Sequence, residues 1–164
     1  MKTFDNVAKL KLATLTEGQF VETGGYYTKG GGGAAKYLIV APQAADGYGD
    51  HVLANGNVAV LEEKDKATLA AFGVVMNGTV ESSEALRAAL AFNVKPTEGT
   101  VWIDPITPLV IDSNKNTAFL GLSKGTLKFQ TSLDDGSRLF EYSGQFQTAE
   151  NFSIGGLNGD IKNF

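Results

Sequence analysis

The stretch that decides the fold of this chain is FGVVMNGTVESSEALRAAL, which runs from Phe72 to Leu90. Its Asn77-Gly78 pair predicts a tight turn, since both residues tolerate the left-handed backbone conformation. Thr79 follows as the expected N-cap of a short helix, with acidic residues in the first turn, where the helix dipole favours them. The helix would be amphipathic and would bury Ala85, Leu86, Ala89 and Leu90. The predicted order is therefore a turn, a capped helix and then β-rich sequence.

Downstream of Thr100, short apolar runs alternate with turn residues at roughly even intervals. The expected strands lie within residues 101–103, 109–111, 118–122, 126–129, 139–142, 151–154 and 160–164. Short strands with regular turns are typical of a sandwich, a barrel or a β-solenoid. The preceding helix favours the solenoid, because the open end of a solenoid exposes apolar surface and strand edges and needs a cap.

Upstream, residues 1–62 are expected to form a small antiparallel β-unit with a leading helix. Phe4, Val7 and Leu10 share one helical face, and Asp5 is the expected N-cap of a helix near residues 4–15. Short strands are expected within residues 19–28, 35–41 and 58–62.

A charged and then alanine-rich segment follows this unit, and we expect a domain boundary near residue 63. Asp65 is a candidate cap of a further short helix, which would hold Ala67, Leu69 and Ala70. The sequence thus predicts two domains, 1–62 and 63–164.

The composition narrows the classes of function. The 164 residues carry a net charge of −4 and no run of Lys and Arg, which argues against a nucleic-acid-binding surface. Cysteine is absent, so disulfides and Cys-ligated metal sites are excluded. No signal peptide and no apolar run of membrane-spanning length is present. We therefore expect a soluble protein made in the cytoplasm, without a nucleic-acid partner, a membrane partner or a cofactor.

Gly30 to Gly33 form an unbroken run of glycines. A glycine-rich loop between a strand and a helix would suggest a phosphate-binding loop. Strands are expected on both sides of this run, however, and no Gly-Lys-Ser/Thr sequence follows it. The favoured interpretation is a mobile hairpin tip, or a place where the backbones of neighbouring subunits approach closely.

Two features are candidates for sugar processing or sugar binding. Glycoside cleavage needs two carboxylates about 5 to 10 Å apart, and Asp134 and Asp135 are an adjacent acidic pair. They lie in Leu-Asp-Asp-Gly-Ser, so a solvated turn is the favoured interpretation. The single tryptophan, Trp102, is expected in a strand, where a core position is favoured over a sugar-stacking platform.

A second polar group lies in the loop that contains Asp46, Asp50 and His51. These side chains could bind a cation, but their spacing matches no known cation cage. A loop held by hydrogen bonds from side chains to the backbone is favoured. A Ser-His-Asp arrangement would have to use His51, and no nucleophile elbow is present. The sequence therefore assigns no catalytic, cofactor-binding or metal-binding residue.

Tyr26, Tyr27 and Tyr37 flank the glycine run and leave two interpretations open. If they are exposed they mark an interface, where tyrosine is favoured, and if they are buried they form the core of the small β-unit. The candidate interface set also includes Phe4, Val7 and Leu10.

Two segments resemble the N-terminal region of bacteriophage tailspike proteins, the trimeric capsule or lipopolysaccharide depolymerases. The first combines FDNVAKLK (4–11), GGYYTKGGGGAAKYLI (24–39), DGYGDH (46–51) and LANGNVA (53–59). The family usually has Gly-Asp-Gly-Gly-Gly-Ala in its glycine tract. Here Gly31 stands at the Asp position and Ala34 at the last Gly position.

The second segment is the opening stretch, which is similar to the family pattern Phe-Gly-Ala-x-Gly-Asp-Gly-x-x-Asp-Asp-Thr followed by a helix. The chain keeps Phe72, Gly73, Gly78, Thr79, Ala85, Leu86, Ala88 and Ala89. It departs at Met76, Asn77, Glu81, Ser82 and Ser83. The turn chemistry survives, since Asn tolerates the same conformations as Asp. Many β-helix proteins of the pectate-lyase-like kind share this opening.

The resemblance implies a mainly β fold with short helices. A small antiparallel β N-terminal domain would precede the helix-capped start of a right-handed parallel β-helix. It further implies a virion component, a homotrimer whose head-binding domain attaches the spike to a tail or baseplate protein or to another tailspike. The β-helix would bind or cleave host surface polysaccharide and so serve host cell adhesion. The chain would stop before the β-helix is complete, so catalytic carboxylates would lie beyond it and this fragment would not be an enzyme.

A rival hypothesis is a compact polysaccharide lyase or hydrolase that acts within these residues and requires a pocket with paired acidic groups. A weaker alternative is a carbohydrate-binding module that uses Trp102 or the tyrosines.

Overall fold

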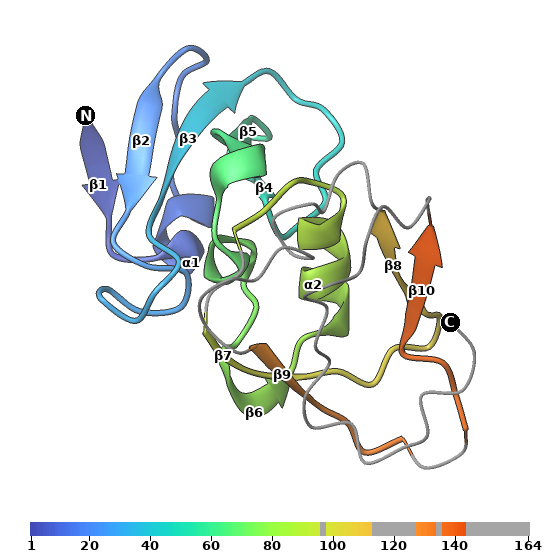
Figure 1. The fold of residues 1–164 in the computed structure, drawn as a ribbon. Helices are drawn as coiled ribbons and strands as arrows, with labels where there is room; N and C mark the ends of the chain where they lie inside the picture. Colours follow the sequence, from blue (N-terminus) through green and yellow to red (C-terminus); the bar gives the residue numbers. More distant parts are fainter. Residues whose placement is uncertain (96–97, 113–126, 134–135, 144–164) are drawn as a thin grey trace.

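The computed structural model describes residues 1–95, 98–112, 127–133 and 136–143. Strands predominate and the helices are short, which confirms the expected fold class (Figure 1). The strands expected at 118–122, 151–154 and 160–164 lie outside the described residues, and so does the pair Asp134 and Asp135.

A five-stranded sheet, which we call the front sheet, organises the first part of the chain. Its spatial order is β1-β2-β3-β5-β4. Its strands are β1 (Lys2–Phe4), β2 (Phe20–Thr23), β3 (Ala35–Val40), β4 (Asp50–Val52) and β5 (Val58–Leu61). The expectation of a purely antiparallel unit needs one correction: β1 runs parallel to β2, while the other pairs are antiparallel. A helix crosses over between β1 and β2, and such a connection brings the chain back in the same direction.

That crossover helix, α1 (Val7–Lys11), is shorter than the helix expected near residues 4–15, because the residues before it are used in β1. Its N-cap is Asn6 and not Asp5. The Lys9 backbone N–H donates to the Asn6 side-chain oxygen at 2.9 Å, which satisfies one of the free donors of the first turn. Val7 and Leu10 point into the core.

Two short 3-10 turns, η1 (Lys64–Lys66) and η2 (Leu69–Phe72), replace the helix expected after Asp65. Asp65 lies inside η1 and does not cap a helix; its carboxylate accepts a hydrogen bond from the Asn93 backbone N–H at 2.9 Å. Between the two turns, Thr68 forms a parallel bridge with Lys95. The segment between η1 and η2 therefore pairs with the segment around Lys95, which lies one turn of the coil later.

The remaining strands are parallel and stack by successive turns of the chain. One sheet contains β6 (Asn77–Glu81), β7 (Gly99–Trp102) and β9 (Leu127–Gln130), and the other pairs β8 (Leu109–Asp112) with β10 (Phe140–Ser143). The chain passes through each sheet once per turn. This is the arrangement of a solenoid, as the helix before the strands predicted, and not that of a sandwich or barrel.

The opening stretch differs from its expected local structure. Asn77 to Glu81 form strand β6 rather than a turn, because they pair with β7, and Gly78 has a φ of 71° where the register shifts. The Thr79 hydroxyl donates to the Asn77 side chain and does not cap the helix. Helix α2 (Ser83–Leu90) begins later, and its N-cap is Ser82.

Helix α2 takes the place of a strand in the first turn. It follows β6 as β8 follows β7 and β10 follows β9, and it packs against β8 (Figure 1). Its predicted apolar stripe is buried, namely Ala85, Leu86, Ala89 and Leu90. The helix thereby covers the apolar end of the coil, as expected from its position in the sequence.

A single cluster of buried apolar side chains extends from α1 and the front sheet to β8. It includes Val7 and Tyr37 at one end, Phe72 between, and Leu109 and Ile111 at the other. The core therefore has no gap at residue 63, and the division into domains 1–62 and 63–164 stays a prediction.

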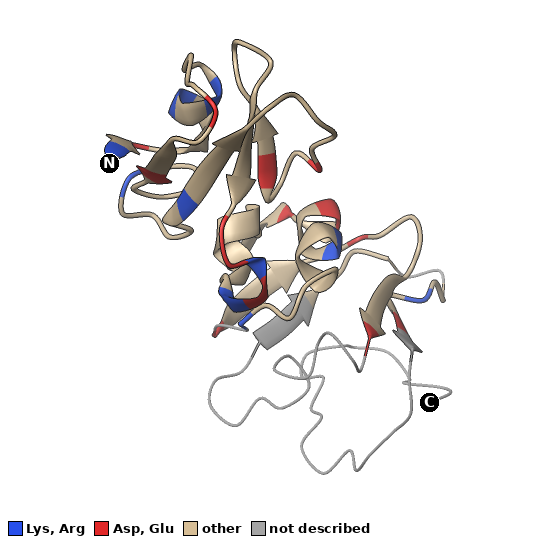
Figure 2. Cartoon of the chain, turned by 90° about the horizontal axis from the view of Figure 1, so that it is seen from above, with Lys and Arg blue, Asp and Glu red and all other residues tan. Residues whose placement is uncertain are grey.

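Across the described ranges, no helix is long and apolar enough to cross a membrane. Figure 2 shows basic and acidic residues interspersed over this part of the chain. Such a mixture gives little long-range attraction for a strongly charged partner of either sign.

Candidate functional site

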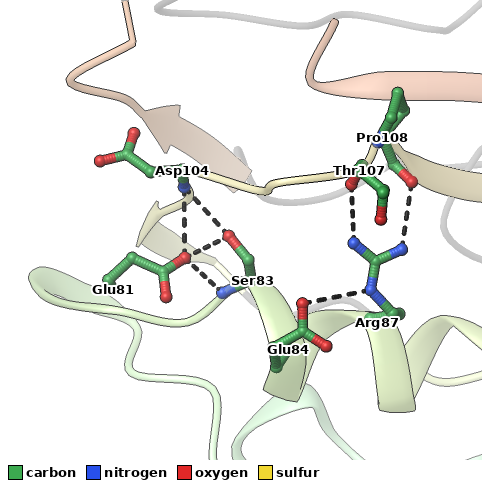
Figure 3. Close-up of polar contacts among 7 residues, drawn as sticks. All are labelled: Glu81, Ser83, Glu84, Arg87, Asp104, Thr107 and Pro108. Atoms are coloured by element: carbon green, nitrogen blue, oxygen red, sulfur yellow. Dashed lines mark hydrogen bonds and ion pairs between the residues drawn. The ribbon is translucent and has the colours of Figure 1, made fainter.

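The candidate site is the entrance of the coil, where α2 and the corners after β6 and β7 meet (Figure 3). Glu81 pairs with Trp102, and Trp102 with Gln130, in the parallel sheet. The residues two positions beyond these three are Ser83, Asp104 and Ser132. They occupy the same place in successive turns, so contacts among them can repeat along the coil.

These three residues form a ladder of hydrogen bonds, which we call the corner ladder. The Asp104 backbone N–H donates to Ser83 Oγ at 3.0 Å, and the Ser132 backbone N–H donates to Asp104 Oδ1 at 2.8 Å. The Ser83 and Asp104 side chains thus each accept the backbone N–H of the counterpart in the next turn. The corners leave the sheet at this point, so the ladder satisfies donors that strand pairing no longer reaches.

Glu81 reinforces the first step of the corner ladder. Its Oε1 accepts hydrogen bonds from the Ser83 backbone N–H at 2.7 Å, from the Ser83 hydroxyl and from the Asp104 backbone N–H at 3.2 Å. Asp104 presents its backbone N–H, not its carboxylate, to Glu81 (Figure 3). The two carboxylates therefore hold backbone in place and are not arranged as an acid and base that share one proton.

Asp104 joins two turns through its carboxylate. It accepts hydrogen bonds from Trp102 Nε1 at 2.9 Å, from Thr131 Oγ1 at 2.8 Å, and from both the backbone N–H and the hydroxyl of Ser132. Partial desolvation acts to raise the pKa of Asp104, but the donors on Ser132, Thr131 and Trp102 outweigh it and lower the pKa to about 2. A carboxyl group with so low a pKa stays ionised near neutral pH and cannot serve there as a general acid.

Arg87 fastens α2 to the chain that leads into β8. Its Nη1 donates to the Pro108 carbonyl at 3.1 Å and its Nη2 to the Thr107 carbonyl at 2.7 Å (Figure 3). Its Nε lies 3.3 Å from Glu84 Oε1 on the same helix. The planar guanidinium offers one nitrogen to each of two successive carbonyls, whereas a lysine has its donors on a single nitrogen.

Glycines bring the front sheet into close contact with η2 and Gly73. A Cβ built on Gly33 would lie 2.2 Å from the Ala70 carbonyl oxygen, and one on Gly73 would lie 2.6 Å from Tyr26 Cζ. Both have positive φ angles, 71° and 86°. A Cβ on Gly49 would lie 2.8 Å from Phe72 Cε1. The backbone approaches here require residues without a side chain.

Part of the predicted glycine run therefore has a packing role. The expectation of close backbone approach is met at Gly33, although the neighbour is Ala70 of the same chain rather than another subunit. At Gly30 a Cβ would meet no atom within 4 Å, as expected of a loop tip.

Side chains bond to the backbone in this segment as expected, but Asp50 and His51 belong to strand β4 and not to a loop, because they pair with β5. Asp46 Oδ1 accepts from the backbone N–H groups of Tyr48 and Asp50, each at 2.8 Å. Asp50 accepts from the Leu61 backbone N–H at 3.1 Å and from Lys64 Nζ at 2.7 Å. No group of three possible metal ligands occurs in the described ranges.

His51 is buried beneath two tyrosine rings. Its ring centroid lies 5.8 Å from that of Tyr26 and 5.7 Å from that of Tyr37. Burial lowers the pKa of His51 to about 4, with a further lowering from Lys11, against the opposing effect of nearby carboxylates. The imidazole is therefore neutral near pH 7 and forms part of the core, not an exposed base.

The candidate interface residues fall into two groups. Val7, Leu10 and Tyr37 are at most 4% exposed, so for Tyr37 the core interpretation holds, and burial raises its pKa to about 12. Tyr27 is 57% exposed, and its hydroxyl donates to the Gly73 carbonyl at 2.7 Å. Phe4 and Tyr26 are partly buried against the core.

Sequence reasoning missed the residues that build the corners. Asp104, Ser132 and Arg87 had been assigned no role, because a hydrogen-bond partner one turn away leaves no local pattern. A signal was available for one of them: Asp104 follows an expected strand directly, at the place where a corner begins. Trp102 was expected in the core; it is half-buried, and its indole N–H donates to Asp104.

No protein-family model and no curated protein matches the sequence, but solved structures match the fold. WceF of Pantoea stewartii is described as a glycan biofilm modifying enzyme with a bacteriophage tailspike-like parallel β-helix fold. It matches with a TM-score of 0.58 at 14% identity, over 79% of this chain. Tailspike gp49 of Acinetobacter baumannii bacteriophage Fri1, a capsular polysaccharide depolymerase, gives 0.58 at 16% identity over 80%.

The enzymatically active domain of tailspike protein 4 from bacteriophage CBA120 gives a TM-score of 0.58 at 17% identity, over 87% of this chain. The fold is that of the phage tailspikes. This chain spans 22%, 23% and 20% of the three matched chains, respectively. The resemblance expected from the sequence is thereby confirmed in the fold. Whether this chain shares an activity of the longer proteins is a matter for proposal.

Proposed function

We propose that this chain is a structural component of a phage tailspike, located in the virion tail. In this role, residues 1–62 attach a homotrimeric spike to a tail or baseplate protein or to another tailspike. Residues 63–164 begin the β-helix, which recognises host surface polysaccharide through coils beyond those described. Synthesis takes place in the host cytoplasm, and no nucleic acid, membrane or cofactor takes part.

The observation that carries this proposal is the match in fold to tailspikes together with the closed entrance. A helix fills the first strand position, and Arg87, Glu81 and Asp104 connect it to the following corners. Arg87 donates to two backbone carbonyls, and Glu81 and Asp104 each accept from a backbone N–H of the following turn. The entrance therefore suits a supporting role better than a catalytic one.

The proposed attachment surface uses Tyr27, the exposed candidate in the segment that connects β2 and β3. Tyr27 presents more than half of its side chain to solvent, whereas the buried Val7, Leu10 and Tyr37 hold the sheet in shape. An exposed aromatic ring next to close-packed glycines offers a rigid contact of the kind favoured at interfaces.

Two measurements test the proposal. Light scattering on the purified chain is expected to give the mass of a trimer, and a stable monomer at micromolar concentration would contradict the homotrimer. Tail particles assembled without this spike are expected to bind the chain in co-sedimentation, and Tyr27→Ala is expected to weaken that binding. Retention of full binding by Tyr27→Ala would exclude Tyr27 from the attachment surface.

A second candidate function is polysaccharide cleavage within this chain. The favouring observation is that the matched structure of tailspike protein 4 is described as an enzymatically active domain. The sequence between β9 and β10 contains Asp134 and Asp135, the acidic pair weighed above. An assay on capsular polysaccharide distinguishes the two functions: turnover that disappears in Asp134→Asn or Asp135→Asn would favour the enzyme.

A further inference from the structure

The contacts between the front sheet and the coil entrance have the character of a protein interior. Three glycines, Gly33, Gly49 and Gly73, allow approaches that a single methyl group would block. The blocked neighbours are a backbone carbonyl and two aromatic rings, from Ala70, Phe72 and Tyr26. Backbone and packed rings cannot move aside cheaply, so each approach is specific to glycine.

Polar contacts span the same boundary. The Tyr27 hydroxyl donates to the Gly73 carbonyl at 2.7 Å. Lys64 lies 2.7 Å from Asp50 on β4, and its ammonium also lies 5.0 Å from the centre of the Phe92 ring beyond α2. The Lys64 and Asp50 side chains are only 18% and 13% exposed, so this pair is largely removed from solvent.

A buried aromatic ring also lies at the boundary. Phe72 is fully buried and stacks on Phe92 within the second part of the chain, with ring centroids 5.8 Å apart. On the side of the first part, a Cβ built on Gly49 would lie 2.8 Å from Phe72 Cε1. Contacts between independent domains within a chain usually resemble transient interfaces, which are more polar than permanent ones. The boundary near residue 63 differs, because glycine-dependent approaches pack it closely and its ion pair is largely removed from solvent.

We propose that the front sheet and the coil entrance fold as one cooperative unit, in which the sheet is the fixed end plate of the coil and not a separable anchoring domain. The glycine-lined contact, which we call the joint, prevents the two parts from moving independently. This inference deepens the proposed function, on which its biological meaning rests. A partner bound to the front sheet would then be rigidly connected to the polysaccharide-recognising coils.

The chain offers one spectroscopic reporter on each side of the joint. His51 is its single histidine, on β4, and Trp102 is its single tryptophan, on β7. Urea unfolding of the 164-residue chain can be followed by the His51 ring signals in proton NMR and by Trp102 fluorescence. One cooperative unit is expected to give coincident transitions. Two separated transitions would overturn the proposal.

Matched glycine variants test whether the joint itself couples the two parts. Gly73→Ala and the control Gly56→Ala have nearly the same backbone strain, since their φ angles are 86° and 85°, but Gly56 has no neighbour within 4 Å. Gly73→Ala is expected to lower the urea midpoint by on the order of 1 M more than Gly56→Ala, equally at both reporters. A Gly73→Ala effect equal to the control, or confined to one reporter, would overturn the proposal.

A milder variant covers the case in which Gly73→Ala does not fold. Tyr27→Phe removes only the hydroxyl that donates to Gly73. It is expected to lower both midpoints together by a few tenths of 1 M, and a change in the His51 transition alone would count against the joint. These measurements involve no phage particle and no polysaccharide. A failure of the proposed tailspike role would therefore leave their outcome unchanged.

Discussion

The front sheet and the corners of the coil are stabilised in opposite ways. The front sheet is held mainly by apolar packing, and it buries the His51 ring, whose two nitrogens have no hydrogen-bond partner in the described part of the chain. In the corners, Asp104 accepts from donors on three residues of its own and the next turn. The comparison teaches that the sheet ends the coil by apolar packing, whereas the hydrogen bonds of the corners can repeat with every turn.

The largest expected effect comes from removing a ring in the apolar core that the front sheet shares with the coil entrance. Phe72→Ala removes a fully buried ring that contacts Phe92 and Gly49. It is expected to lower the free energy of unfolding by about 3 to 5 kcal/mol, measured by urea unfolding with Trp102 fluorescence. Phe20→Ala, at a ring that is 51% exposed, is the control and should cost much less. Equal losses in the two variants would show that the buried Phe72 ring stabilises the fold no more than the half-exposed Phe20 ring.

Acid is expected to weaken the front sheet through His51. The pKa of its imidazole is about 4 in the folded chain and about 6.5 when unfolded, so the unfolded state binds the extra proton first. The stability from the neutral ring is complete above pH 6.5 and is lost progressively as the pH falls from 6.5 to 4, by about 3 kcal/mol.

Urea unfolding at a series of pH values measures this loss, and NMR titration of the His51 ring gives its pKa directly. In His51→Gln the part of the pH dependence between 6.5 and 4 should disappear. An unchanged slope in that variant would assign the acid sensitivity to other groups.

The corner ladder gives an intermediate effect, and its pH dependence has the same sign as that of His51 but lies at lower pH. Asp104→Ala removes an ionised acceptor of hydrogen bonds from Trp102, Thr131 and Ser132, and is expected to cost about 2 kcal/mol. Because the folded pKa of Asp104 is lowered, its contribution is complete above pH 4 and is lost as the pH falls through about 2.

Thermal unfolding at neutral pH measures the cost of Asp104→Ala. Asp5→Asn is the matched control, because the Asp5 side chain is 67% exposed and its only described ion pair, with Lys29, is 3.9 Å long. If both variants unfold at the temperature of the parent chain, the corner ladder does not stabilise the coil.

The smallest expected effect concerns the attachment of α2. Arg87→Lys keeps the charge but carries all its donors on one nitrogen and loses the planar pair that fits the carbonyls of Thr107 and Pro108, so we expect a loss of about 1 kcal/mol. Glu84→Gln removes only the exposed pair with Arg87, which is worth at most about 0.5 kcal/mol. Urea midpoints of the two variants rank the contacts, and a larger effect of Glu84→Gln would reverse the assignment.

The elements with a strong local pattern could be predicted, and the others could not. The stripe of α2 was correct because the spacing of Ala85, Leu86, Ala89 and Leu90 is visible within two turns of helix. The predicted start of α2 was wrong. Thr79 is a residue type that suits an N-cap, but pairing with β7 holds Asn77 to Glu81 in a strand instead. Asp5 likewise lost the N-cap of α1 to Asn6, because the residues before α1 joined the sheet as β1.

The candidate site was less predictable than the fold. The interface candidates Val7, Leu10 and Tyr37 are apolar or aromatic residues, and such residues suit an interface and a core equally well in sequence. The hydrogen bonds in the polar loop were correct because Asp46 reaches donors only a few residues away. The partners of Asp104 lie a full turn later, and their distance in the chain depends on corner lengths that no local pattern reveals.

By itself, the sequence determined that the chain forms short strands behind an amphipathic helix, because side-chain periodicity and turn residues act over a few neighbouring positions. It also placed glycines at Gly33 and Gly73, without showing what those glycines contact. Only the tertiary structure decided that these two glycines close the joint and that Asp104 bridges successive turns. The physical reason is that packing and hydrogen bonding between distant segments depend on how the whole chain is arranged in space.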